Sequence, residues 1–197
     1  MRTLFQIAIL FTSTLVLSQD SRVFDNLKVN SKILNQERSY AVYLPADYDS
    51  SERSYPVLYL LHGLGDDQTG WIKLGDVQRI TDESINSGIS TPMIIVMPDA
   101  NTGVTGYINY PDRDWFYEDF FFEELIPHVE SEYRIKKGKQ YRAISGLSMG
   151  GGGTLVYALH RPDLFSSAAA LSPAIGPKDI DDFQKWISRY NYYFNDK

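Results

Sequence analysis

Residues 146–150 read Gly-Leu-Ser-Met-Gly, which fits the pattern G-x-S-x-G. A predicted strand at 141–145 precedes them directly, and a helical run at 154–159 follows. A serine nucleophile needs this strand–turn–helix context, because a sharp, strained turn lifts its hydroxyl above the sheet edge. The pattern predicts Ser148 as a nucleophile that forms an acyl-enzyme. The alternative is a flexible loop, since residues 150–153 are four glycines.

A serine that transfers an acyl group also needs hydrogen-bond donors aimed at the developing oxyanion. In a strand–turn–helix of this kind, one donor is the backbone N–H after the nucleophile, here that of Met149. The second comes from the loop after the third strand, where residues 62–65 read His-Gly-Leu-Gly. We expect Leu64 to supply it, with Gly63 as the alternative donor. A plain glycine-rich turn is the other interpretation.

The general base is harder to find. Hydrolases whose nucleophilic serine lies on such a strand–turn–helix have a catalytic triad in the chain order serine, then acid, then histidine. No histidine follows His160, which lies about 18 Å along the helix that begins at the serine and is therefore too far away. His128 has the position of a surface residue. His62 could approach Ser148 from the neighbouring strand, but it belongs to the predicted oxyanion turn.

The acids after the serine offer no clear replacement either. Asp179, Asp181 and Asp182 are interpreted as charges at a helix N-terminus. The sequence thus predicts a nucleophile and an oxyanion site without their base and orienting acid. We expect a truncated gene product or a fragment of a longer reading frame, with the catalytic histidine and aspartate beyond Lys197.

The elements that position these residues alternate between strands and helices. Strands are predicted at 23–29, 38–44, 56–61, 92–97, 141–145 and 166–171. Helices are predicted at 77–88, 122–133 with a kink near Pro127, 154–159 and 182–190. This alternation indicates the α/β class, with a mostly parallel central sheet covered on both faces. We expect one domain over 19–197, lacking the last strands and helix of the fold.

The composition is that of an ordinary globular protein, with 43% hydrophobic and 22% charged residues among 197. The net charge of −6 argues against a nucleic-acid or anionic-membrane partner. The absence of cysteine excludes disulfides, thiolate metal sites and cysteine nucleophiles.

Residues 1–18 have the pattern of a cleaved signal peptide. A basic start at Met1-Arg2 leads into a mostly apolar run over 4–17, and small or polar residues follow. A membrane anchor is the alternative, but the run is shorter than the ~20 residues needed to span a bilayer. We therefore expect a secreted or periplasmic protein without stable membrane insertion after cleavage.

Several spaced motifs over residues 38–173 together resemble the esterase D-like family. The motifs are 60–63 (LLHG), Trp71, 97–99 (MPD), 117–119 (YED), 124–127 (ELIP), 146–151 (GLSMGG) and 161–165 (RPDLF). This family includes feruloyl and acetyl-xylan esterases, tributyrin esterases, S-formylglutathione hydrolase and the mycolyltransferases. The resemblance implies an α/β-hydrolase with a Ser-His-Asp triad, acting on small acyl esters without a cofactor or metal.

The resemblance assigns the nucleophile to Ser148 and the oxyanion donors to Leu64 and Met149. It places Trp71 in the wall of the substrate pocket, although a packing role under a surface helix is the alternative. In the loop at 100–115, Tyr107 and its aromatic neighbours could stack on a sugar or phenolic ring. Ordinary packing beneath a long loop is the alternative there.

The function that these residues favour is an exported carboxylic-ester hydrolase that removes feruloyl or acetyl groups from carbohydrates. The signal peptide disfavours the cytosolic S-formylglutathione role. An acyltransferase of the mycolyltransferase type is the nearest alternative, because it shares the acyl-enzyme. A non-catalytic carbohydrate-binding remnant is the alternative from another class, since the triad histidine and acid are missing.

Overall fold

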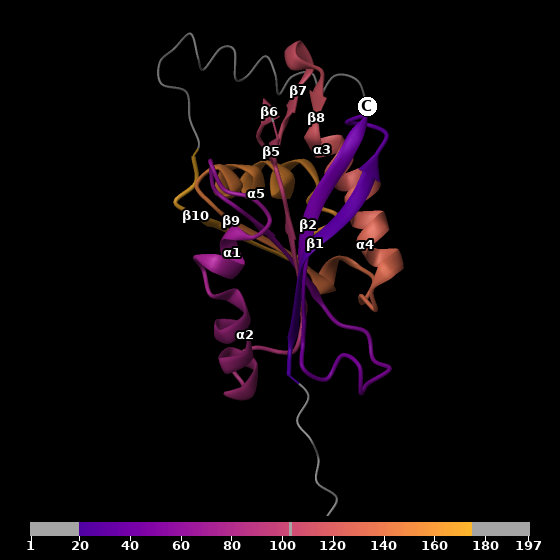
Figure 1. Ribbon diagram of the computed structural model, residues 1–197, viewed down its shortest axis with the longest axis vertical. Coiled ribbons are helices and arrows are strands. Elements are labelled where there is room, and N and C mark those ends of the chain that lie inside the picture. The colour runs from indigo at the N-terminus through magenta and orange to yellow at the C-terminus, as the bar shows by residue number, and fades with distance from the viewer. Residues whose placement is uncertain (1–19, 103, 175–197) are drawn as a thin grey trace, which may run out of the picture.

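The computed structural model describes residues 20–102 and 104–174, and a six-stranded sheet forms their centre (Figure 1). In space the strands follow the order β1-β2-β4-β3-β9-β10. Their bounds are β1 (Arg22–Ser31), β2 (Gln36–Leu44), β3 (Val57–Leu61), β4 (Ile94–Pro98), β9 (Arg142–Leu147) and β10 (Ser167–Leu171). β1, β2 and β4 pair antiparallel, whereas β4, β3, β9 and β10 pair parallel. The predicted α/β class with a mostly parallel sheet is confirmed.

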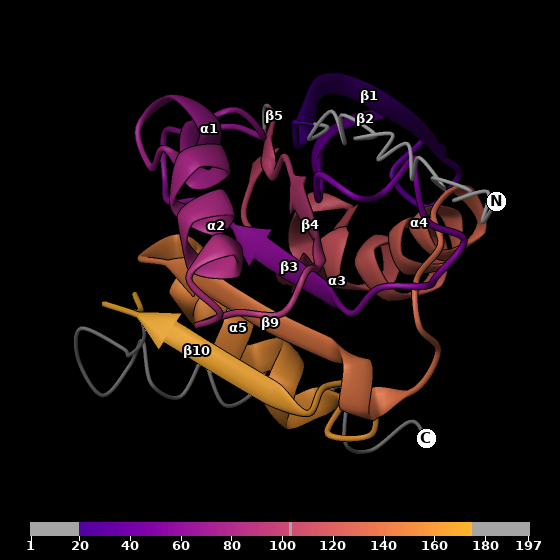
Figure 2. The ribbon, with the colours of Figure 1, turned by 90° about the horizontal axis from the view of Figure 1, so that it is seen from below.

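Helices cover both faces of this sheet (Figure 2). One face carries α1 (Gly70–Lys73) and α2 (Val77–Asn86). The other carries α3 (Tyr117–Asp119), a π-helix (Phe120–Leu125), α4 (Ile126–Glu132) and α5 (Met149–His160). Alternate residues of each strand face opposite sides, so Val42 and Tyr59 lie in the larger core while Tyr43 and Leu60 lie in the smaller one.

The segment between β4 and α3 is built from short pieces. It contains β5 (Asn101–Thr102), β6 (Val104–Thr105), β7 (Asn109–Tyr110), a 3₁₀ turn (Pro111–Arg113) and β8 (Trp115–Phe116). β5 pairs with β6 and β7 pairs with β8, each antiparallel. A further 3₁₀ turn (Lys139–Tyr141) leads into β9.

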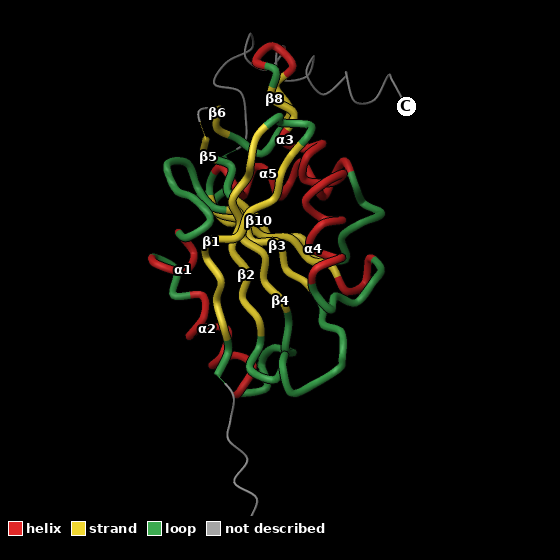
Figure 3. Tube along the Cα trace, turned by 45° about the vertical axis from the view of Figure 1, so that its right-hand side comes forward, coloured by secondary structure: helices red, strands yellow, loops and turns green. Residues whose placement is uncertain are grey.

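The helix predicted over 122–133 is two helical types in the structure. The π-helix runs to Leu125, and α4 begins at Ile126 with Pro127 in its first turn. A proline lacks the N–H that a helix interior uses, and the first turn is where that loss is tolerated. The strands β1 and β2 form a long hairpin whose tip lies close to the helices of this face (Figure 3). At this tip, Glu124 on the π-helix accepts hydrogen bonds from Ser31 Oγ at 2.5 Å and Lys32 N at 2.9 Å.

Some predictions lie outside the described residues. These are the signal peptide at 1–18, the helix at 182–190 and the acids Asp179, Asp181 and Asp182. Among residues 20–102 and 104–174, no helix is long and apolar enough to cross a membrane.

Candidate active site

Ser148 alone makes the connection between β9 and α5. Its backbone has φ +55° and ψ −112°, a region that residues other than glycine rarely adopt. Three hydrogen bonds hold it there: its N–H donates to Leu171 O at 2.9 Å, and its carbonyl accepts from Gly152 N and Ala174 N. Strain of this kind persists only where the surrounding structure fixes it, and it concentrates at functional sites.

Glycines allow the backbones around this turn to approach closely. A Cβ added to Gly146 would lie 2.4 Å from Gly150 O, and one added to Gly150 would lie 2.5 Å from Leu61 O. The first turn of α5 therefore packs backbone against backbone on the ends of β3 and β9. This packing directs the positive end of the α5 dipole toward the Ser148 turn.

The predicted oxyanion turn lies directly against Ser148. Asp66 N donates to Gly63 O at 3.4 Å, and Gly65 has φ +81°, so residues 63–66 form a tight turn that requires glycine at its third position. A Cβ added to Gly63 would lie 3.8 Å from Ser148 Cβ. Within the described part of the chain, no group accepts a hydrogen bond from the N–H of Leu64 or Met149. Both predicted donors are thus available beside the serine turn.

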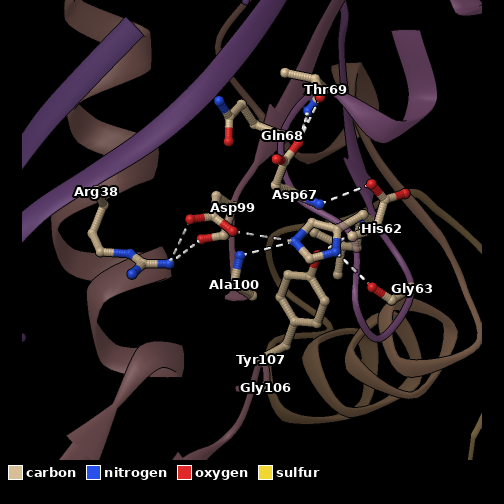
Figure 4. Close-up of polar contacts among 12 residues, drawn as sticks. Arg38, His62, Gly63, Asp67, Gln68, Thr69, Asp99, Ala100, Gly106 and Tyr107 are labelled. Atoms are coloured by element: carbon tan, nitrogen blue, oxygen red, sulfur yellow. Dashed lines mark hydrogen bonds and ion pairs between the residues drawn. The ribbon is translucent and has the colours of Figure 1, made fainter. Parts of the chain in front are cut away.

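His62 is buried beneath this turn, with a relative exposure of 1% (Figure 4). Its Nδ1 lies 2.7 Å from Gly63 O, and its Nε2 accepts a hydrogen bond from Ala100 N at 2.9 Å. Its own backbone N–H donates to the Tyr107 hydroxyl at 2.8 Å. Since both ring nitrogens are bonded to backbone groups, neither is left to take a proton from Ser148. The structure therefore disfavours the interpretation of His62 as the general base.

Next to His62 lies a buried ion pair between Arg38 and Asp99 (Figure 4). Arg38 Nη2 lies 3.3 Å from Asp99 Oδ2 and also donates to the Asp99 carbonyl, which accepts the Tyr117 hydroxyl as well. The guanidinium carbon of Arg38 lies 5.4 Å from the Trp115 ring centroid. Asp99 Oδ1 lies 3.6 Å from His62 Nε2, so the Arg38–Asp99 ion pair lies against the histidine beneath the turn at residues 63–66.

Sequence reasoning did not single out Arg38 or Asp99 as site residues. A signal was present, because His62 and Asp99 each follow a buried strand and those two strands run parallel. The carboxyl ends of parallel neighbours meet at one sheet edge, which is where α/β proteins place their sites.

Tyr107 is placed in the core rather than at the surface. Its side chain is 2% exposed, its ring packs edge-on against His62 and Tyr117, and its carbonyl accepts the Tyr157 hydroxyl. Burial raises the pKa of its phenol well above the ordinary value. A ring covered in this way presents no face to a sugar, so the structure favours packing over substrate stacking for Tyr107.

Trp71 lies on α1, close to the same edge of the sheet. Its ring is half-buried against the smaller core, and its Nε1 donates to Leu61 O at 3.1 Å. The indole N–H is therefore used within the protein, while part of the ring remains accessible.

The other two histidines also have partners. His128 Nε2 lies 2.9 Å from the Tyr40 hydroxyl, on the face of the sheet that carries α4. His160, in the last turn of α5, pairs through Nδ1 with Glu118 Oε1 at 2.7 Å. No group of three metal-ligating side chains converges anywhere in the described ranges.

Comparison with known proteins identifies the family. The protein-family model described as "Putative esterase" matches residues 31–192. An endo-1,4-beta-xylanase/feruloyl esterase of Xylanibacter ruminicola is 35% identical over 150 residues, which are 72% of this chain and 20% of the relative. Esterase Rv1288 of Mycobacterium tuberculosis is 38% identical over 154 residues, 75% of this chain and 32% of the relative. The chain thus spans only a fifth to a third of these relatives.

Solved structures give the same result. A ferulic acid esterase has a TM-score of 0.78 at 37% identity, covering 83% of this chain and 63% of its own. A ferulic acid esterase of Anaeromyces mucronatus, solved with ferulic acid, has a TM-score of 0.68 at 28% identity, covering 84% and 62%. The family model matches well over half of the sequence. The chain therefore belongs to the "Putative esterase" family, of the α/β-hydrolase type.

Proposed function

We propose that this chain carries the nucleophile and oxyanion site of a secreted serine carboxylic-ester hydrolase that removes feruloyl or acetyl groups from carbohydrates. The observation that carries the proposal is the strained Ser148 turn, with φ +55° between β9 and α5 and with Gly63 packed against it. One relative, the endo-1,4-beta-xylanase/feruloyl esterase of Xylanibacter ruminicola, supports the substrate class. The leader pattern at 1–18 supports secretion.

In the proposed reaction, Ser148 Oγ attacks the ester carbonyl carbon and the carbonyl oxygen becomes an oxyanion. The N–H groups of Leu64 and Met149 donate to that oxyanion, which stabilises charge present only in the transition state and intermediate. The alcohol then leaves with a proton, and water hydrolyses the acyl-enzyme to restore the serine. The exposed part of the Trp71 ring is our candidate for one wall of the substrate pocket.

The proton of the serine hydroxyl needs a base, and the three histidines of the sequence are bonded to other groups. Without a base the serine remains a neutral alcohol, which is a poor nucleophile. We therefore propose that the 197-residue chain hydrolyses esters slowly. Binding and the oxyanion site alone still supply roughly 10³–10⁴-fold over water in enzymes that lack their triad.

Covalent labelling tests the nucleophile directly. A fluorophosphonate probe should modify purified chain at Ser148, as located by peptide mass spectrometry, and Ser148→Ala should abolish the adduct. Ser145→Ala is the matched control, because Ser145 lies on the same strand and its hydroxyl bonds to Ala169 O. An adduct that survives in Ser148→Ala, or a wild-type chain that takes up no probe after prolonged incubation, would contradict the proposal.

A further inference from the structure

We propose that His62 is a positioning residue, which uses its Nδ1–H to hold the Gly63–Leu64 peptide so that the Leu64 N–H faces the reacting oxygen. This inference rests on the proposed esterase function, because it concerns the second donor of that oxyanion site. It assigns to His62 a role that neither proton transfer nor simple core filling describes.

The tautomer of His62 follows from its two partners. Ala100 N can only donate, so Nε2, which lies 2.9 Å from it, must be the unprotonated acceptor. Gly63 O can only accept, so Nδ1, which lies 2.7 Å from it, must carry the proton. The ring is therefore neutral, with a single tautomer fixed by backbone groups on both sides.

The bond to Gly63 O determines where the Leu64 N–H points. The Gly63 carbonyl and the Leu64 N–H belong to one planar peptide group, and the described residues contain no cis peptide bond. In a trans peptide the C=O and N–H point in opposite directions. The buried imidazole and, at the longer distance of 3.4 Å, the Asp66 N–H both hold the Gly63 carbonyl, so the N–H of the same peptide points away from these two groups. A Cβ on Gly63 would lie 3.8 Å from Ser148 Cβ, so this peptide adjoins the serine turn.

His62 is itself fixed from several directions. Ala100 and Asp99 follow β4, Tyr107 receives the His62 N–H, and Arg38 on β2 compensates the Asp99 carboxylate. These contacts join the turn to the ends of two strands and to the loop after β4. The imidazole therefore cannot tilt without breaking bonds to groups that are themselves buried.

Three variants separate the donor function of His62 from its bulk. In His62→Asn the side-chain amide nitrogen occupies the place of Nδ1 and can still donate to Gly63 O. In His62→Gln the amide reaches toward Ala100 instead, and in His62→Ala both bonds are lost. The readouts are the residual kcat and KM for p-nitrophenyl acetate, and the amide NMR signal of Leu64.

We expect His62→Gln and His62→Ala to lower the residual kcat by about 10²-fold, the usual effect of losing one oxyanion donor, with KM little changed. His62→Asn should retain kcat within about 3-fold and keep a Leu64 amide signal closer to that of the wild type than His62→Ala does, because it restores the shorter of the two bonds that hold the Gly63 carbonyl. Equal losses in His62→Asn and His62→Ala, with both folded by circular dichroism, would overturn the inference.

Ring nitrogen NMR of the unmodified chain tests the same inference without any variant. A proton on Nδ1 supports it, and a proton on Nε2 overturns it even if every variant fails to fold. This readout is also independent of the proposed function. A chain that takes up no fluorophosphonate would contradict the esterase proposal, whereas the ring signals would still decide how the turn is held.

Discussion

Gly150→Ala is the perturbation that most directly tests the packing of α5 against the sheet. A Cβ at this position would lie 2.5 Å from Leu61 O, 2.6 Å from His62 O and 2.7 Å from Leu61 C. All three atoms belong to the backbone, so no side-chain rotation relieves the overlap. To restore ordinary contact near 3.4 Å, the start of α5 must move away from β3 by about 0.9 Å.

The expected cost follows from this displacement. Overpacking a well-packed interior typically costs 1–3 kcal/mol, and contacts this short with rigid backbone correspond to about 3 kcal/mol. Alanine gains up to about 1 kcal/mol over glycine in helix propensity, which offsets part of that cost. The free energy of unfolding should therefore fall by about 2 kcal/mol. For a domain of this size that lowers Tm by about 4–8 °C.

Urea and thermal unfolding, followed by far-ultraviolet circular dichroism, measure this change. Gly63→Ala is the matched control, because its added Cβ would meet Leu147 O at 3.7 Å and Ser148 Cβ at 3.8 Å, both ordinary contacts. The control should stay within about 0.5 kcal/mol of the wild type. Unchanged stability in Gly150→Ala, or the same loss in both variants, would refute the proposed backbone-on-backbone packing.

Two further substitutions probe buried polar groups. The Tyr59 hydroxyl is buried near Arg142 and has no hydrogen-bond partner among residues 20–102 and 104–174, and burial raises its pKa far above the ordinary value of 10.0. Tyr59→Phe should leave the stability at pH 7 unchanged or raise it by up to about 1 kcal/mol. Above pH 10 the unfolded chain loses the Tyr59 proton and the folded chain keeps it, so wild-type stability falls there. In urea titrations at pH 8, 10 and 11, the variant should therefore lose about 1 kcal/mol less than the wild type between pH 10 and 11 and little less below pH 10, and parallel curves would contradict this. Arg38→Met removes the cation that compensates the buried Asp99 carboxylate, and should cost about 3 kcal/mol in urea unfolding at pH 7, whereas a neutral result would show that Asp99 does not need it.

Local signals in the sequence predicted the Ser148 turn and the strands around it. The glycines at 146 and 150, the strand pattern before them and the helical run after them all act within a few residues of the serine. Such patterns depend on backbone sterics and hydrophobic periodicity, which a single segment of sequence expresses. The six predicted strands correspond to the six strands of the central sheet for the same reason.

The surroundings of His62 could not be predicted in the same way. Arg38, His62 and Asp99 come from three different strands or their ends, and only the order of those strands in the sheet brings them together. The π-helix was missed because its wider turn leaves a hydrophobic pattern that periodicity interprets as an ordinary helix with a kink at Pro127.

Tyr107 shows why the loop at 100–115, which is rich in aromatic residues, was the hardest segment to interpret. Aromatic residues in a loop indicate either a stacking surface or a buried anchor, and the sequence does not distinguish them. In the structure, the His62 N–H needs an acceptor at the end of β3, and the Tyr107 hydroxyl supplies it. The Tyr107 ring packs where Gly153 leaves room, since a Cβ at Gly153 would lie 2.8 Å from Tyr107 Cβ. Tyr107 therefore joins the predicted oxyanion turn, the loop after β4 and α5, which makes this loop part of the support for the candidate site.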